Sequence, residues 1–145
     1  VAICVGDPNK RMEIARKYES NPNLLFPIID LTNGGISPDA TIGKGCILSK
    51  GSVASANVTL GDFVFLNINA TVCHDGTIED FVTISPGATL AGNVSVGERT
   101  FFGVNASVIP GQTIGASVTV GAGAVVISDI KDGVVVAGVP AREVG

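Results

Sequence analysis

Apolar residues recur at every sixth position along most of the chain, from Ile36 to Val125. A period of six is a multiple of two and not of 3.6, so each six-residue segment, or hexad, predicts a short strand and a turn. One hexad cannot bury its own apolar side, but stacked hexads share a continuous apolar core. The pattern therefore predicts a mainly β, solenoid fold. The apolar positions that step by six are Ile36, Ile42, Leu48, Ala54, Leu60, Leu66, Val72, Ile78, Ile84, Leu90, Val96, Phe102, Val108, Ile114 and Val120.

The first 33 residues follow a different pattern, which predicts a strand, a helix and a second strand. Val1–Val5 is apolar and ends at a glycine, and Asp7 can cap a helix that runs from Pro8 to about Tyr18. Leu24–Ile29 predicts a short edge strand. Because a βαβ unit of this size is too small to fold alone, we expect it to be the C-terminal part of a larger α/β domain that begins before Val1.

The chain thus divides into an N-terminal unit, residues 1–33, and a solenoid, residues 34–145. The hexads keep their register without an inserted loop, so any site must be built on the coils themselves. After Val126 the rhythm lapses. Gly133–Ala137 and the following GVPAR, Gly138–Arg142, predict a last strand and a proline turn that end the stack.

Composition narrows the possible partners. The chain has 46% apolar and only 15% charged residues, a net charge of −4 and no basic run, which argues against nucleic acid. No apolar stretch approaches the length of a membrane span. The chain has an odd number of cysteines, and they are widely spaced: Cys4, Cys46 and Cys73. This arrangement fits a reduced cytoplasmic protein. With so few charges, the faces of the prism are expected to be buried against copies of the same chain.

His74 is the single histidine, and so the one side chain with an ordinary pKa that exchanges a proton near neutrality. It lies two residues after Val72, at a turn position from which its ring should project outward. Asp75 follows, and Asp75-Gly76 is a turn signal that lets adjacent side chains share one side. A carboxylate there can hold the imidazole tautomer. The alternative is a solvated surface histidine beside an aspartate.

Three segments resemble a known family. The run NINATVCHDGTIEDFVTISPGATLAGNVSVG (67–97), the later GAGAVV and the closing GVPAR are similar to hexapeptide-repeat sugar acetyltransferases, which make acetylated sialic acids and N-acetylated nucleotide 4-amino sugars in bacteria. VGDPNKR (5–11) matches the end of that family's nucleotide-sugar domain. The resemblance implies a left-handed parallel β-helix with three hexads per coil, hence five coils, and a homotrimer.

The resemblance also implies a mechanism, in which acetyl-CoA is the co-substrate and no metal takes part. His74 aligns with the family's general base and Asp75 with its helper acid, in a cleft between protomers. His74 would take a proton from an acceptor amine or hydroxyl as it attacks the thioester. Gly92 aligns with the amide that faces the thioester oxygen; otherwise it is a plain turn glycine.

Further contacts carry over from the family position by position. CoA contacts fall on Thr83, Val104 and Ala122, and acceptor contacts fall on Asn67 and Gly6. The chain departs from the family at Thr83, where many relatives have a second histidine, and at Ala122, which replaces a glycine. For Asn67, a purely structural role is as good an interpretation as contact with the acceptor.

Two other functions stay open. Carbonic anhydrases with this type of helix bind a metal, but they need several histidine ligands and this chain has one. A non-catalytic solenoid scaffold or binding module is the second alternative. Regular Thr-rich or apolar ladders would favour it, whereas the outward positions read as mixed and the His-Asp pair as singular.

Overall fold

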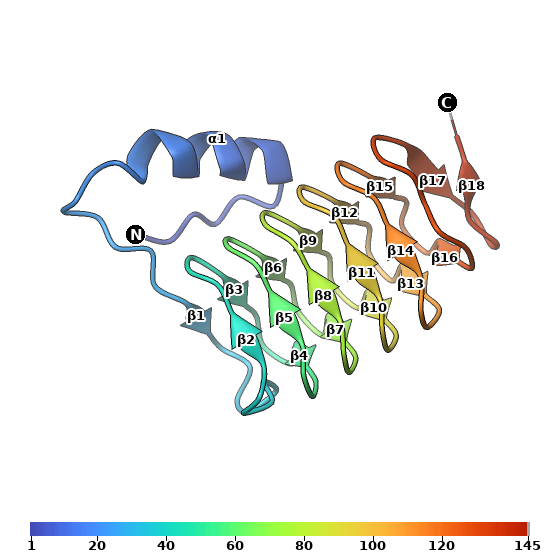
Figure 1. Ribbon diagram of the computed structural model, residues 1–145, viewed down its shortest axis with the longest axis horizontal. Coiled ribbons are helices and arrows are strands. Elements are labelled where there is room, and N and C mark those ends of the chain that lie inside the picture. Colours follow the sequence, from blue (N-terminus) through green and yellow to red (C-terminus); the bar gives the residue numbers. More distant parts are fainter. Residues whose placement is uncertain (145) are drawn as a thin grey trace.

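From Ile42 onward, each predicted apolar position is the second residue of a two-residue strand, whereas Ile36 forms an isolated bridge to Ala54. The computed structural model describes residues 1–144 as a parallel β-solenoid with one helix at its side (Figure 1). The hexad strands are β2 (Thr41–Ile42), β3 (Ile47–Leu48), β4 (Val53–Ala54), β5 (Thr59–Leu60), β6 (Phe65–Leu66), β7 (Thr71–Val72), β8 (Thr77–Ile78), β9 (Thr83–Ile84), β10 (Thr89–Leu90), β11 (Ser95–Val96), β12 (Phe101–Phe102), β13 (Ser107–Val108), β14 (Thr113–Ile114), β15 (Thr119–Val120) and β16 (Val125–Val126).

The strands form three parallel sheets, because each residue pairs with the residue eighteen positions later. Val72 pairs with Leu90, for example, and Ile78 with Val96. The first sheet has the order β1-β3-β6-β9-β12-β15-β17-β18, the second β16-β13-β10-β7-β4 and the third β14-β11-β8-β5-β2. Three hexads therefore make one coil, and β2 to β16 make five coils, but with β1 and β17 the stack has about six turns, one more than expected. β1 (Ile29–Asp30) and β17 (Val135–Ala137) extend the first sheet, and β18 (Arg142–Glu143) closes it antiparallel to β17.

The chain turns each corner through a residue in the left-handed region of backbone space. The φ angles of these residues run from 55° at Ser117 to 76° at Gly111. Glycine, Asn and Asp adopt this conformation most readily, which explains their frequency in the hexads. The left-handed corner residues are Gly45, Gly51, Asn57, Phe63, Asn69, Asp75, Phe81, Gly87, Asn93, Arg99, Asn105, Gly111, Ser117 and Gly123. Side chains of successive coils consequently stack at the same three corners.

The N-terminal unit contains the expected helix but not the expected strands. Helix α1 (Pro8–Tyr18) begins after Asp7, whose carboxylate accepts a hydrogen bond from the Lys10 amide at 3.0 Å. The segments 1–5 and 24–29 touch where the Val1 amino group donates to the Leu25 carbonyl. They form no ladder with one another, and β1, which starts at residue 29, pairs with β3 of the solenoid instead.

Helix α1 lies along the corner that joins the third sheet to the first (Figure 1). Phe63 and Phe81 stand at this corner with left-handed backbones that are unfavourable for aromatic residues. Their rings stack with centroids 5.2 Å apart, and they are buried against Ile3 and Ala15. Burial of the two rings offsets the backbone strain. Within residues 1–144, α1 is the one helix, and it is too short and too polar to cross a bilayer.

Candidate active site

His74 lies at the corner between the second and third sheets, after β7 and before β8. Its side chain is 59% exposed, which confirms that the ring projects outward from the core. Nδ1 of the imidazole is 2.8 Å from Oδ2 of Asp75. The left-handed backbone of Asp75, with φ 59°, brings the side chains of these adjacent residues to the same side. The two residues therefore form a hydrogen-bonded pair.

The carboxylate of Asp75 decides which imidazole nitrogen is free. The pKa of Asp75 is lowered from its usual value by a hydrogen bond from Asn57 and, second, by the bond from His74. Asp75 is therefore ionised at neutral pH and can only accept hydrogen bonds. Neutral His74 must then carry its proton on Nδ1, which leaves the lone pair of Nε2 available as a base.

Gly92 lies directly against the imidazole, one coil beyond His74. A Cβ atom at Gly92 would be 2.5 Å from both Cε1 and Nε2 of His74, so any larger residue would displace the ring. Within residues 1–144 the Gly92 N–H donates to no backbone acceptor. The corner thus combines a basic nitrogen with a neighbouring unpaired amide, the two groups that acyl transfer requires.

Asn67, Val104 and Ala122 lie at a different corner, between the first and second sheets. Oδ1 of Asn67 accepts a hydrogen bond from the Ile68 amide at 2.8 Å, which gives its side chain a structural partner. Val104 is 46% exposed, and Ala122 follows it by eighteen residues at the same corner. The width of the second sheet separates these residues from His74 within one chain.

Thr83 and Gly6 lie together on the first sheet, where the N-terminal unit packs. Thr83 is 2% exposed, and its hydroxyl donates to the Gly6 carbonyl at 2.7 Å and accepts from Nη2 of Arg11 at 2.9 Å. The Thr83 hydroxyl therefore fastens the N-terminal unit to the solenoid, and its role as a CoA contact stays a prediction. A Cβ at Gly6 would meet no atom within 4 Å, so open space adjoins this glycine.

The third sheet is more regular than the sequence suggested. Its outward residues are hydroxyl-bearing and exposed in all five strands: Thr41, Thr59, Thr77, Ser95 and Thr113. Shallow grooves of about 330 and 240 Å³ run beside them over glycine-rich turns. Thr is common at exposed strand positions because its branched side chain suits a pleated surface. The ladder by itself therefore identifies no ligand.

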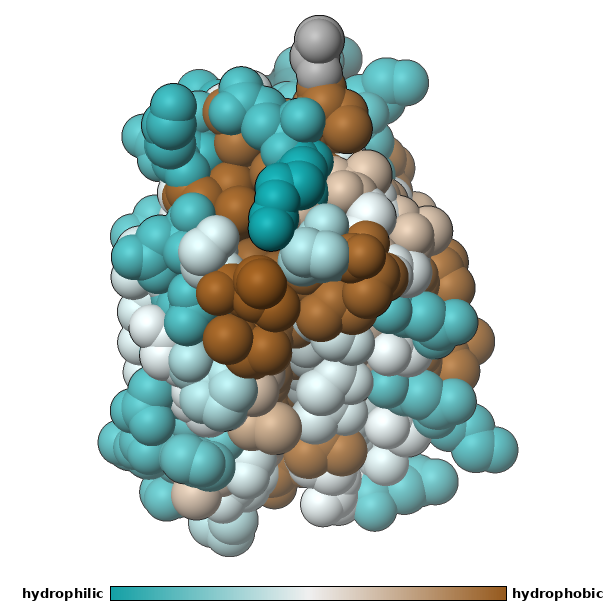
Figure 2. Space-filling model, turned by 90° about the vertical axis from the view of Figure 1, so that its right-hand side faces the viewer, coloured by the Kyte–Doolittle hydropathy of each residue, from teal (hydrophilic) through white to brown (hydrophobic). Residues whose placement is uncertain are grey.

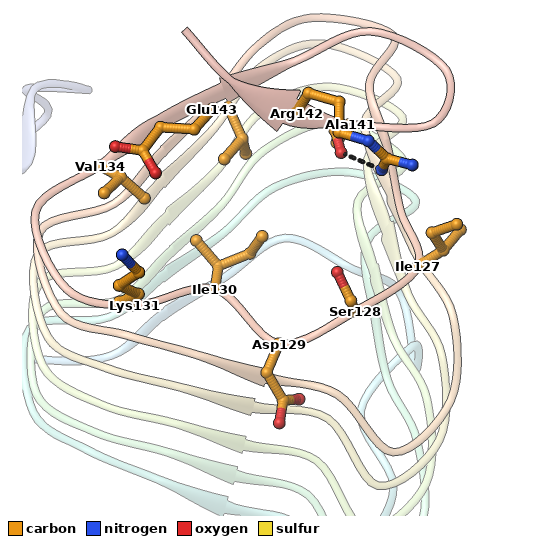
Figure 3. A pocket seen from close by; sticks show the side chains of 10 residues that line it. Ile127, Ser128, Asp129, Ile130, Lys131, Val134, Ala141, Arg142 and Glu143 are labelled. Carbon is orange, nitrogen blue, oxygen red and sulfur yellow. Dashed lines mark hydrogen bonds between the residues drawn. The ribbon is translucent and has the colours of Figure 1, made fainter. Parts of the chain in front are cut away.

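A cavity of about 400 Å³ lies at the C-terminal end of the stack, far along the solenoid from His74 (Figure 3). There the coil shortens, and Ile130 bridges to Ile114 after sixteen residues. Ile130 and Val134 line the cavity, with Lys131 and Glu143 at one side. Figure 2, which faces this end, shows apolar residues gathered across it. The cavity marks the place where a further coil would stack, and it contains no histidine.

Sequence reasoning missed two residues that organise these regions. Asn57 donates to Asp75, and its position eighteen residues earlier was the signal that could have revealed the contact. Arg11 is 1% exposed and donates to five solenoid or N-terminal carbonyls; the helix pattern gave no sign of this. No group of three or more potential metal ligands occurs among residues 1–144.

Comparison with known proteins places this geometry in a family. No family model and no curated protein sequence matches the chain. Among solved structures, a mutant of GDP-perosamine N-acetyltransferase from Caulobacter crescentus, in complex with CoA and GDP-perosamine, has a TM-score of 0.93 and 37% identity over 99% of this chain and 68% of that one.

Two further structures agree. The acetyltransferase domain of PglB from Neisseria gonorrhoeae, in complex with acetyl coenzyme A, gives a TM-score of 0.92 and 38% identity over 99% of this chain and 69% of that chain. WeeI from Acinetobacter baumannii gives 0.87 and 28% identity over 99% and 70%. The repeat, the three-sheet solenoid and this identity over nearly the whole chain show that it belongs to the hexapeptide-repeat sugar acetyltransferases.

Proposed function

We propose that the chain transfers the acetyl group of acetyl-CoA to the amine of a nucleotide-linked amino sugar, with His74 as the general base. The observation that carries the proposal is the position of the imidazole, with Nδ1 against Asp75 and Nε2 against Gly92. The Caulobacter and Neisseria structures, which hold CoA or acetyl-CoA, support the co-substrate. GDP-perosamine in the former supports the acceptor class.

The proposed reaction needs no acyl-enzyme. The acceptor nitrogen attacks the thioester carbonyl, and Nε2 of His74 takes the proton that this nitrogen loses. The Gly92 N–H stabilises the negative charge that develops on the carbonyl oxygen. Collapse of the tetrahedral intermediate breaks the carbon–sulfur bond, and the imidazolium returns the proton to the leaving thiolate, which departs as CoA. Asp75 stabilises the imidazolium through Nδ1.

We further propose that the site is shared between protomers of a homotrimer. Within one chain, the His74 corner and the corner with Val104 and Ala122 lie on opposite edges of the second sheet. Exposed apolar residues flank this sheet on both sides, Ile68 (52%) and Val104 at one corner and Ile109 (38%) and Ile127 (44%) at the other. Rotational association that joins one corner to the other in the next protomer covers both sets and completes the site.

The test of the base is release of free CoA with GDP-, UDP- and dTDP-linked amino sugars, and with sialic acid as the alternative acceptor. We expect turnover with an amino-sugar nucleotide and its loss in His74→Ala. Calorimetry should show that this variant still binds CoA, because the substitution removes a base and not the CoA contacts. Undiminished turnover in His74→Ala would remove the proposal, and turnover with sialic acid alone would change the acceptor.

The test of the shared site is co-expression of two inactive variants. His74→Ala removes the base, and Ala122→Trp blocks the other corner. Mixed trimers regain activity if the two corners of one site come from different chains, whereas sites built within one chain stay inactive in every mixture.

The three free thiols, Cys4, Cys46 and Cys73, support a reducing, cytoplasmic setting for the reaction.

A further inference from the structure

The carboxylate of Asp75 is held at both of its oxygens. Oδ2 faces Nδ1 of His74 at 2.8 Å, and Oδ1 accepts a hydrogen bond from Nδ2 of Asn57, also at 2.8 Å. Asn57 lies one coil below Asp75, and both residues have left-handed backbones, with φ of 56° and 59°. The Asp75 amide also donates to the Ala56 carbonyl at 3.0 Å. The lower coil therefore fixes both the backbone and the side chain of Asp75.

Such a hold matters because the pair lies in contact with water. The side chains of His74 and Asp75 are 59% and 44% exposed, and the terminal torsion of an aspartate is broad. Water competes for Oδ2 whenever the carboxylate rotates away from the imidazole. An ionised carboxylate can only accept hydrogen bonds, so the bond that Nδ2 of Asn57 donates to Oδ1 restrains this rotation. The amide itself stands on a corner whose backbone is fixed by the ladder bonds of its coil.

We propose that Asn57 is a positioning residue for the acetyl transfer, which directs Oδ2 of Asp75 at Nδ1 of His74 and so keeps the base in the tautomer with a free Nε2. The inference rests on the proposed function of His74. Asn57 touches neither the imidazole nor Gly92 and acts through Asp75. The second left-handed corner residue after Asn57, Asn69, also has φ of 56° and is exposed, but its side chain makes no hydrogen bond within residues 1–144. Asn69 is therefore a matched control.

The direct test is the tautomer of His74, measured by ¹⁵N NMR of the imidazole without substrate. The spectrum is simple because His74 is the single histidine. The variants are Asn57→Gly and the control Asn69→Gly, since glycine keeps the left-handed backbone without strain. We expect a neutral ring with the proton mainly on Nδ1 in the wild type and in Asn69→Gly, and a shift toward the Nε2–H form in Asn57→Gly. An unchanged tautomer in Asn57→Gly would overturn the inference.

Kinetics provide the second readout. One exposed hydrogen bond is worth about two- to tenfold, so kcat should fall by about this factor in Asn57→Gly while KM for acetyl-CoA stays constant. Asn57→Asp keeps the size of the side chain but replaces the donor by a second carboxylate, so its loss should be at least as large. If His74→Ala keeps its activity, the proposed function fails whatever the tautomer. If His74→Ala is inactive but both Asn57 variants keep the wild-type kcat, only the positioning role is overturned.

Discussion

The buried guanidinium of Arg11 gives the sharpest prediction for stability. Arg11 is 1% exposed and has no carboxylate partner among the ion pairs of residues 1–144. Nε donates to the Phe63 carbonyl at 2.9 Å, Nη1 to Val5 at 2.6 Å and Nη2 to Phe81 at 2.6 Å. The side chain thus joins helix α1 to the corner of two successive coils. Arg11→Met keeps much of the volume and removes every one of these bonds.

The magnitude follows from two opposing effects. Burial lowers the pKa of Arg11 to about 10, so holding the cation there costs about 3 kcal/mol. Each hydrogen bond from a charged donor contributes about 1.5–3 kcal/mol, and the Phe63 and Phe81 carbonyls accept no other backbone bond within residues 1–144. The hydrogen bonds therefore win, and Arg11→Met should weaken the docking of α1 by about 3–5 kcal/mol.

The assay is native-state hydrogen exchange of the α1 amides. A loss of this size raises the open fraction of α1 by about a hundredfold or more, while the coil amides keep their protection because their ladder bonds are untouched. Arg16→Met is the matched control, since Arg16 is exposed on the same helix and its substitution should lower the stability of the helix by about 1 kcal/mol at most. Arg11→Lys keeps the charge without the planar fork and should resemble Arg11→Met. Equal protection of α1 in the Arg11→Met and Arg16→Met proteins would refute the reasoning.

Three further predictions concern the site and the core. Gly92→Ala should lower kcat by about a hundredfold without changing the unfolding midpoint, because the new Cβ displaces the exposed His74 ring; unaltered kcat would contradict the stacking. Asn57→Gly should raise the pKa of Asp75 in a ¹³C carboxyl titration, since it removes the main cause of its lowering. Burial raises the pKa of Cys46 from 9.0 to about 11, so the thiol should resist Ellman's reagent at neutral pH until the protein unfolds. The difference in unfolding free energy between the wild type and Cys46→Ala should be largest below about pH 9. It should fall as the pH rises to about 11, because the thiol of the unfolded chain loses its proton at a lower pH than that of the folded chain.

The solenoid could be predicted because its physics is local and repeated. A small set of residue types at each sixth position fixes strand, turn and inward face, and every coil repeats the same solution. The N-terminal unit lacked this redundancy. Its apolar segments 1–5 and 24–29 have strand-like composition, but a strand exists only where a partner completes its ladder, and here the solenoid recruits Ile29 to pair with Ile47 instead. The burial of Arg11 was hidden for the same reason, since it depends on contacts with residues more than fifty positions away.

The candidate site likewise has features that adjacent residues predict and features that depend on distant contacts. The outward ring of His74 and its contact with Asp75 follow from adjacent residues at a turn, so the sequence could predict them. The hydrogen bond from Asn57 and the closeness of Gly92 depend on the eighteen-residue coil, which becomes visible once three hexads are known to make one turn. Thr83 shows the limit of alignment. The resemblance predicts a CoA contact at this position, whereas in this chain the hydroxyl donates to the Gly6 carbonyl and accepts from Arg11.

Stacked corners explain how an exposed site can still be well ordered. Three successive coils each contribute one element to the His74 corner: the Asn57 amide from below, the His74–Asp75 pair, and the glycine at position 92 from above. Backbone hydrogen bonds tie these coils together, including the Asp75 amide to the Ala56 carbonyl and the Asn93 amide to the His74 carbonyl at 2.9 Å. Because the spacing of the coils is set by the ladder, the distances between these groups do not depend on a buried pocket. The solenoid thus supplies at this corner the preorganisation that other enzymes obtain by enclosure.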